Sequence, residues 1–240
     1  MTEQPSESII NRIKALLSMA EHPNSNENEA AIAMEKAQAM LLEYNLTIAS
    51  IKTEEIIDEA VQKFDVHSEH GFVWKSRLLN IIAKSNLCYV IVTPNLKMAY
   101  LFGKKTNVNI TMDMFVWVKE QLESISLRKF TAYKTSGGKE HGKTWKTSFF
   151  YGATNVINSR LQKPIEEFSN GSGYSIVLAN DNAIQTVVHS VFPSIRQGVN
   201  RKINLSNSGY SAGKEAGVNI KFARTGTLPG GSRLALGSGT

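Results

Sequence analysis

Between residues 74 and 125 the spacing of hydrophobic residues changes twice, and no other feature of the sequence restricts the fold as strongly. Three- and four-residue spacing predicts a helix over residues 74–82. The β-rich run 87–93 then reaches Pro94-Asn95, which turns the chain into a second strand at 97–102, so we expect a hairpin. A long helix follows up to residue 125. This pattern predicts an α-β-β-α unit at the centre of an α+β domain.

A helical hairpin is expected ahead of this unit. Apolar residues recur at helical spacing over residues 9–20 and again over 30–44, and the run His22-Pro23-Asn24-Ser25-Asn26 between them favours a turn. The two helices are expected to pack antiparallel. Residues 46–62 are interpreted as a further short helix or an acidic linker.

Further helices are expected after the unit. Helical spacing over residues 145–161 predicts one, which Pro164 would end or kink, and residues 182–191 predict another. Residues 172–178 are interpreted as a strand, and the tail 225–240 as loop-like.

Three glycines near the end of the chain, Gly209, Gly213 and Gly217, stand four residues apart and would leave a bare face on a helix. Such a face either lets another element pack closely or lets the backbone approach a phosphate. We favour close packing.

The distribution of charge divides the chain near residue 62. Residues 1–62 hold eleven acidic and four basic residues, a net charge of −7, whereas residues 63–240 hold ten acidic and 23 basic residues, a net charge of +13. We therefore expect an acidic helical hairpin with its linker (1–62) and a basic α+β domain (63–240). The basic domain is expected to bind a polyanion, or to receive the acidic unit as its own docking partner, or both.

Composition narrows the class of protein. The hydrophobic share of 42% and the charged share of 20% are typical of globular proteins, and no run approaches the roughly 18 apolar residues of a membrane span. The start of the chain has no pattern of a secretory signal, and the single cysteine, Cys88, excludes an internal disulfide. We therefore expect a cytoplasmic protein without membrane contact. Cys88 lies in an apolar strand, where a buried, inert thiol is expected.

The hairpin resembles a known family in three runs, at residues 12–20, 28–38 and 41–46. They are similar to the domain-of-unknown-function family DUF 2786, found at the N-terminus of many phage and bacterial proteins. The remainder, including Leu101-Phe102-Gly103, is similar, more loosely, to the uncharacterised domain that usually follows. The resemblance implies a phage or mobile-element origin and a two-part architecture. It implies no catalytic residue, because the family has no established activity.

One motif matches a phosphate-binding loop. Residues 137–144 satisfy G-x-x-x-x-G-K-[ST], in which backbone N–H groups and a lysine hold phosphates. A Walker B echo exists in residues 176–178 followed by Asp181. However, a P-loop follows a buried strand, and residues 127–135 are too polar for one. We therefore prefer a basic, glycine-rich loop to a nucleotide-hydrolysing site.

The segment 128–146 supports a different hypothesis, the binding of DNA or RNA. It is expected to form a polar, basic loop with six cations, one acid and interleaved aromatic residues, a composition suited to phosphate contacts and to stacking on unpaired bases. A second basic group later in the chain would extend this surface. The candidate nucleic-acid-binding residues are Arg128, Lys129, Tyr133, Lys134, Lys139, Lys143, Trp145, Lys146, Arg201 and Lys202.

The favoured function is thus a non-enzymatic nucleic-acid-binding accessory protein of low sequence specificity. One alternative is a module that inhibits a host protein through the hairpin. Another is a P-loop-like or metal-dependent phosphohydrolase or nuclease. The cluster His67-Ser68-Glu69-His70 is the main candidate for a metal, but no zinc motif accompanies it, so no metal and no cofactor are predicted.

Overall fold

A computed structural model of the chain describes residues 61–67, 70–169, 174–195 and 203–222, together with six isolated positions. These six positions, all helical, are Arg12, Ile13, Ala15, Leu16, Lys36 and Met40. The rest of the predicted hairpin, its linker and the predicted tail at 225–240 lie outside the described residues. The division into 1–62 and 63–240 therefore stays a prediction.

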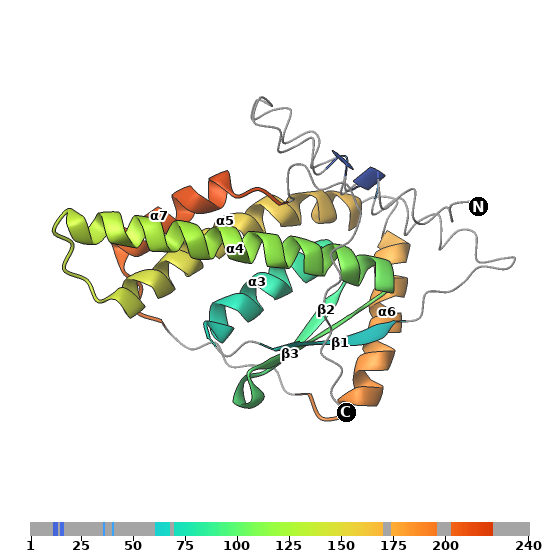
Figure 1. Ribbon diagram of the computed structural model, residues 1–240. Coiled ribbons are helices and arrows are strands. Elements are labelled where there is room, and N and C mark those ends of the chain that lie inside the picture. Colours follow the sequence, from blue (N-terminus) through green and yellow to red (C-terminus); the bar gives the residue numbers. More distant parts are fainter. Residues whose placement is uncertain are drawn as a thin grey trace, which may run out of the picture.

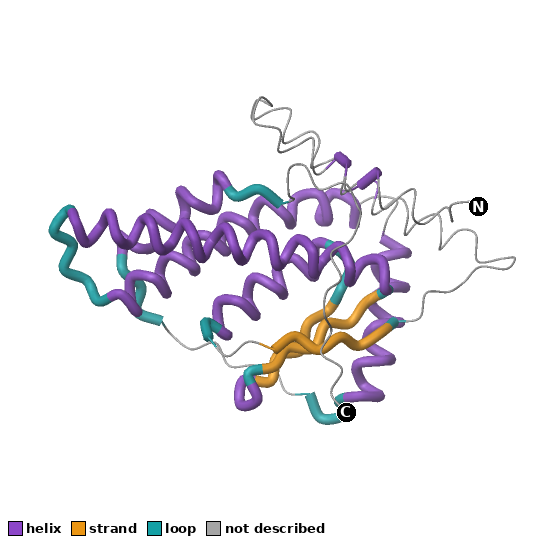
Figure 2. Tube along the Cα trace, in the orientation of Figure 1, coloured by secondary structure: helices purple, strands orange, loops and turns teal. Residues whose placement is uncertain are grey.

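The fold contains a three-stranded antiparallel sheet (Figure 1 and Figure 2). Strand β3 (Met98–Gly103) is central, between β1 (Gln62–His67) and β2 (Tyr89–Thr93). Strands β2 and β3 form the predicted hairpin, joined by the 3-10 turn Pro94–Leu96. The sequence analysis did not predict β1, an edge strand with the charged residues Lys63 and Asp65 paired on one face.

The two faces of the sheet pack against different helices. On β3, Ala99 and Leu101 belong to the main core, whereas Tyr100 and Phe102 belong to a second, smaller cluster. This alternation is the two-residue period of a strand. The second cluster is completed by helix α6 (Tyr174–Val191), which covers the opposite face of the sheet from α3 and α4 (Figure 1).

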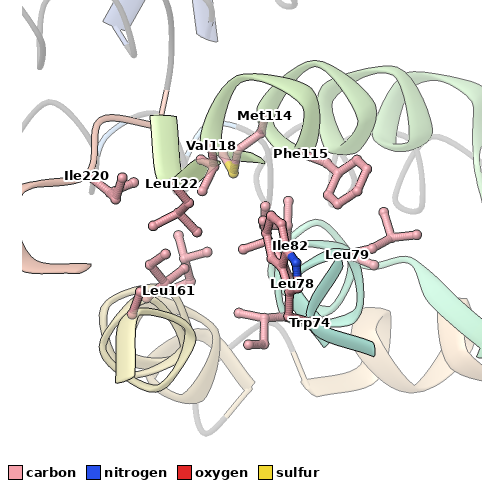
Figure 3. Packing of buried hydrophobic residues seen from close by; sticks show 14 of the residues in the cluster. Trp74, Leu78, Leu79, Ile82, Met114, Phe115, Val118, Leu122, Leu161 and Ile220 are labelled. Carbon is pink, nitrogen blue, oxygen red and sulfur yellow. The ribbon is translucent and has the colours of Figure 1, made fainter. Parts of the chain in front are cut away.

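The main core lies between the sheet and four helices. Helix α3 (Phe72–Ser85) packs on the sheet, on α4 (Lys105–Thr135) and on α5 (Gly142–Ser169), while α7 (Asn207–Asn219) packs along α5. Figure 3 shows the side chains of α3 and α4 meeting Leu161 of α5 and Ile220, the residue after α7. The contributors from α3 and α4 labelled there are Trp74, Leu78, Leu79, Ile82, Met114, Phe115, Val118 and Leu122. The architecture is α+β, and the predicted α-β-β-α order is confirmed in α3, β2, β3 and α4.

Helix α4 is longer than the sequence analysis predicts. The expected loop over residues 128–146 is wrong, because α4 and α5 occupy most of it and leave only residues 136–141 between them. The inner face of α4 continues through Ser126, Phe130 and Tyr133, which follow one another at four- and three-residue spacing and are at least half-buried. Lysine and arginine are good helix formers, so the cations on the outer face do not interrupt the helix.

The strand expected at residues 172–178 is also wrong, since the described part of it, from Tyr174, is the beginning of α6. A short β-branched run does not by itself distinguish a strand from a helix. The helix predicted at residues 182–191 is confirmed as the remainder of α6. Pro164 does not end α5, which continues beyond it.

Helix α7 packs parallel to the first half of α5 through a contact made largely of main-chain atoms. Three glycines of α7 lie against the main chain of α5, Gly209 nearest to Trp145, Gly213 to Phe149 and Gly217 to Ala153. A Cβ on Gly217 would lie 2.7 Å from the Ala153 carbonyl oxygen, too close for an ordinary contact. We call this contact the glycine seam. It confirms close packing as the role of the four-residue glycine spacing.

Candidate functional site

The cations of residues 128–146 gather at a projecting end of the molecule. The last turns of α4, the connection 136–141 and the first turn of α5 form this end, which lies opposite α6 in Figure 1. We call residues 128–146 the basic tip. It holds six lysine or arginine residues and one acid, Glu140.

The two glycines of the basic tip end helix α4. The Gly138 N–H donates to the Tyr133 carbonyl (2.9 Å), the Gly137 N–H donates to the Lys134 carbonyl (3.1 Å), and Gly137 has a φ of 87°. This pair of bonds is a Schellman motif, which needs a left-handed residue just past the helix end. The Lys134 ammonium group also donates to the Gly138 carbonyl (3.0 Å). The glycine pair is therefore a helix cap.

The G-x-x-x-x-G-K-[ST] match does not have the architecture of a P-loop, because it follows a helix and not a strand. Several N–H groups that a P-loop would offer to phosphate are already donated within the protein. Besides the two glycines, the Glu140 N–H donates to the Tyr133 hydroxyl (3.2 Å) and the Lys143 N–H to His141 Nδ1 (3.3 Å).

The Walker B echo also does not have the secondary structure that the motif requires. Residues 176–178 lie in helix α6 and not in a strand, and the exposed Asp181 lies on that helix, at the other end of the molecule from Lys143 (Figure 1). These two motifs therefore do not support a P-loop phosphohydrolase.

The aromatic residues of the basic tip hold α4 and α5 together. Trp145 is 1% exposed and stacks between Tyr133 and Phe149, with both pairs of ring centroids 5.7 Å apart. The expectation that Trp145 stacks on an unpaired base is wrong, because its position on α5 turns the indole inwards. Tyr133 is half-buried, with its ring on Trp145 and its hydroxyl on the Glu140 N–H.

Three of the candidate cations are engaged inside the protein. Lys129 forms an ion pair with Glu215 of α7 (2.8 Å), and the Lys146 ammonium lies 5.3 Å from the centre of the Phe130 ring. The Lys134 ammonium donates to the Gly138 carbonyl, as described above. The three lysines still contribute positive charge to the basic tip, but each side chain is held in one orientation by its partner in the protein.

The other three cations of the basic tip are turned to solvent. The side chains of Arg128, Lys139 and Lys143 are exposed and have no hydrogen bond or ion pair within the described part of the chain. Arg128 borders a shallow depression on α4 together with Leu127 and Thr131. Arg201 and Lys202, the remaining candidates, lie outside the described residues.

The one acid of the basic tip is directed at α7. Glu140 accepts a hydrogen bond from the Ser206 hydroxyl, which in turn accepts from the Gly209 N–H (3.0 Å) and so caps α7. The Glu140 carboxylate therefore takes part in a contact that holds α7, and it is the one acid within the basic tip.

Cys88 is buried, as expected, beneath the central strand of the sheet. Burial raises the pKa of its thiol to about 12, despite a hydrogen bond from the Thr111 hydroxyl that acts in the opposite direction. No group of three or more histidine, cysteine, aspartate or glutamate side chains able to hold a metal occurs among the described residues. Ser68 and Glu69 of the histidine cluster lie outside that set.

Two features of the structure escaped the sequence analysis. The first is the cap at Gly137, which a glycine after a lysine-bearing helix end can signal. The second is a pair of lysines, Lys75 and Lys119, that line a pocket elsewhere in the molecule and that hydrophobic spacing does not single out.

The chain was compared with protein families, with curated proteins and with solved structures. Residues 8–47 match the family described as "Protein of unknown function (DUF2786)", which confirms the resemblance seen in the hairpin. No curated protein and no solved structure resembles the chain significantly. The match ends before β1, so the described residues from 61 onwards lie outside it. Within residues 61–222, as far as they are described, no helix has the length and apolar character of a membrane span.

Proposed function

We propose that this protein binds nucleic acid through the basic tip and catalyses no reaction there. The observation that carries the proposal is the set of three exposed, unpaired cations, Arg128, Lys139 and Lys143, at a projecting helical end. Lysine and arginine neutralise backbone phosphates and release the counterions that surround them. Lys134 and Lys146 add positive charge without being free to reorient.

The mode of binding follows from the burial of the aromatic residues. Since Trp145 is in the core and Tyr133 is held by it, the basic tip offers charge and no stacking platform. Contacts would go to phosphates, so single and double strands of DNA or RNA would bind with little sequence preference. The proposal includes an accessory role in a phage or mobile element, in the host cytoplasm.

The test is fluorescence anisotropy of labelled single- and double-stranded DNA and RNA over a salt series. Three phosphate contacts predict a slope of about −2.7 for log affinity against log salt on duplex DNA. The variant Lys139→Ala/Lys143→Ala should make this slope shallower by about 2 and weaken binding to all sequences alike.

A matched control separates the basic tip from general charge. Lys84 and Lys105 are exposed lysines at the ends of α3 and α4 away from the tip, so Lys84→Ala/Lys105→Ala removes the same charge elsewhere. We expect it to change the slope far less. Equal losses in the two double variants would refute a role for the basic tip, and the absence of binding at low salt would refute the function itself.

A further inference from the structure

A pocket of about 180 Å³ opens between α3, α4 and the sheet, and it shares no residue with the basic tip. Its apolar wall is formed by Leu79 of α3, Phe115 of α4, Ala99 of β3 and Val66 of β1. Figure 3 shows Leu79 and Phe115 facing each other at one side of the core cluster. Ligand sites in proteins are concave and mostly apolar, with a few polar groups that fix orientation.

Two lysines supply the polar part of this pocket. Lys119 of α4 is half-buried and has no hydrogen bond or ion pair within the described part of the chain. Lys75 of α3 has a side chain that is 18% exposed, and its ammonium lies 2.9 Å from a carboxylate oxygen of Glu123. The pocket wall therefore carries one cation with a partner and one without.

The neighbouring end of α3 adds to this positive character. Phe72, Lys75 and Ser76 line the pocket from the first two turns of α3, and the first turn carries no acidic residue and no side-chain cap. The N-terminal end of a helix favours negative charge. The charged groups that line the pocket are thus both cations, and apart from Ser76 its other lining residues are apolar.

We propose that this pocket binds a small monocarboxylic acid whose apolar body is about the size of a benzene ring. A closed apolar cavity of about 150 Å³ accommodates benzene, so a pocket of about 180 Å³ that opens to the surface has room for a ring of this size. The body packs between Leu79, Phe115 and Ala99, and the carboxylate accepts hydrogen bonds from Lys119 and from the outer side of Lys75. This site is independent of nucleic-acid binding, since its residues lie outside the basic tip.

The first experiment is calorimetric titration of the full chain with benzoate, benzamide and acetate. Benzamide has the shape of benzoate without its charge, and acetate has the charge without the ring. We expect benzoate to bind at least about tenfold more tightly than either, because hydrogen bonds to charged groups are the stronger ones. Equal affinities for benzoate and benzamide, or no binding of benzoate at millimolar concentration, would overturn the proposal.

Variants then locate the site. Lys119→Met keeps the aliphatic stem and removes the charge, so it should weaken benzoate at least about tenfold and leave benzamide unchanged. Lys84→Met is the matched control, because Lys84 is an exposed lysine of α3 that does not line the pocket. It should change the affinity for neither benzoate nor benzamide. Benzoate binding that is the same in Lys119→Met as in the original chain would contradict the assignment.

A second measurement does not depend on variants. Methyl NMR spectra of the unmodified chain should show benzoate-dependent shifts at Val66 and Leu79, and far smaller shifts at Leu127 of the helix face beside the basic tip. Shifts concentrated at Leu127 would place the acid on the basic tip and overturn the pocket. Loss of nucleic-acid binding in the Lys139→Ala/Lys143→Ala variant, with these methyl shifts unchanged, would show that the two sites are separate.

Discussion

Replacing Gly213 by alanine tests whether the glycine seam holds α7 on α5. A Cβ at this position would lie 2.7 Å from the carbonyl carbon and 2.9 Å from the Cα of Phe149, and nearer still to the carbonyl oxygen. The atoms in the way are main chain of another helix, so no side chain can rotate to make room. Helix α7 would have to move outwards by about 1 Å, a gap that forfeits up to about half of a dispersion contact.

The magnitude follows from two opposing effects. Overpacking of a tight contact costs about 1–3 kcal/mol or more, and the backbone clash places Gly213→Ala at the upper end. The higher helix propensity of alanine than of glycine stabilises the folded state by about 1 kcal/mol and opposes this cost. We therefore expect the free energy of unfolding to fall by at least about 2 kcal/mol, which for a chain of this length lowers the Tm by about 4–8 °C.

The assay is urea denaturation followed by circular dichroism, together with a thermal scan. Ser211→Ala is the matched control, because Ser211 is exposed on the same helix. It should change stability by no more than about 0.5 kcal/mol. If Gly213→Ala were as stable as this control, or more stable by the 1 kcal/mol of helix preference, the glycine seam would not be the close main-chain contact described here.

Three further variants or measurements test other contacts. Cys88 should resist thiol reagents at pH 8 in the native protein and react after unfolding; because its folded pKa of about 12 exceeds the ordinary 9.0, the free energy of unfolding should fall as pH rises above 9, and Cys88→Ala should lack this component. Arg160→Met removes hydrogen bonds to the carbonyls of Gly217 and Ile220 (2.8 and 2.9 Å) and should lower the free energy of unfolding by about 1–2 kcal/mol in urea titrations. Ser206→Ala removes the cap of α7 and should cost about 1 kcal/mol in the same assay.

The parts of the fold that the sequence predicts are those with strong hydrophobic periodicity. Helix α3 and the hairpin of β2 and β3 follow from their spacing and from Pro94 in the turn. Strand β1 was not recognised in the same way, because only two apolar residues, Phe64 and Val66, alternate there with charged ones. Lys63 and Asp65 pair with Phe102 and Tyr100 of β3, and this pairing makes the segment a strand. The prediction of a strand at the start of α6 was wrong for a different reason. The apolar run there fits both a strand and a helix, and only its packing against the sheet decides between them.

The composition of the candidate site could be predicted from the sequence, but its secondary structure and the burial of its aromatic residues could not. Counting charges identifies residues 128–146 as basic, and the exposure of Arg128, Lys139 and Lys143 agrees with a surface role. Counting does not show that α4 continues through this segment, nor that Trp145 is buried by partners on two helices. Both depend on tertiary contacts that local spacing does not contain.

The glycine seam has a consequence for how α7 finds its place. Glycines four residues apart recur about every 6 Å along a helix, so a slide by one turn would bring Gly213 opposite Trp145 and Gly217 opposite Phe149. The smooth repeat therefore accepts more than one alignment of the two helices. The ends of α7 remove this ambiguity: the Ser206 N–H donates to the Ser148 hydroxyl (2.7 Å) at one end, and Arg160 donates to two carbonyls at the other. Polar contacts of α7, such as these at its two ends, rather than the glycines along it, select the single alignment that is observed.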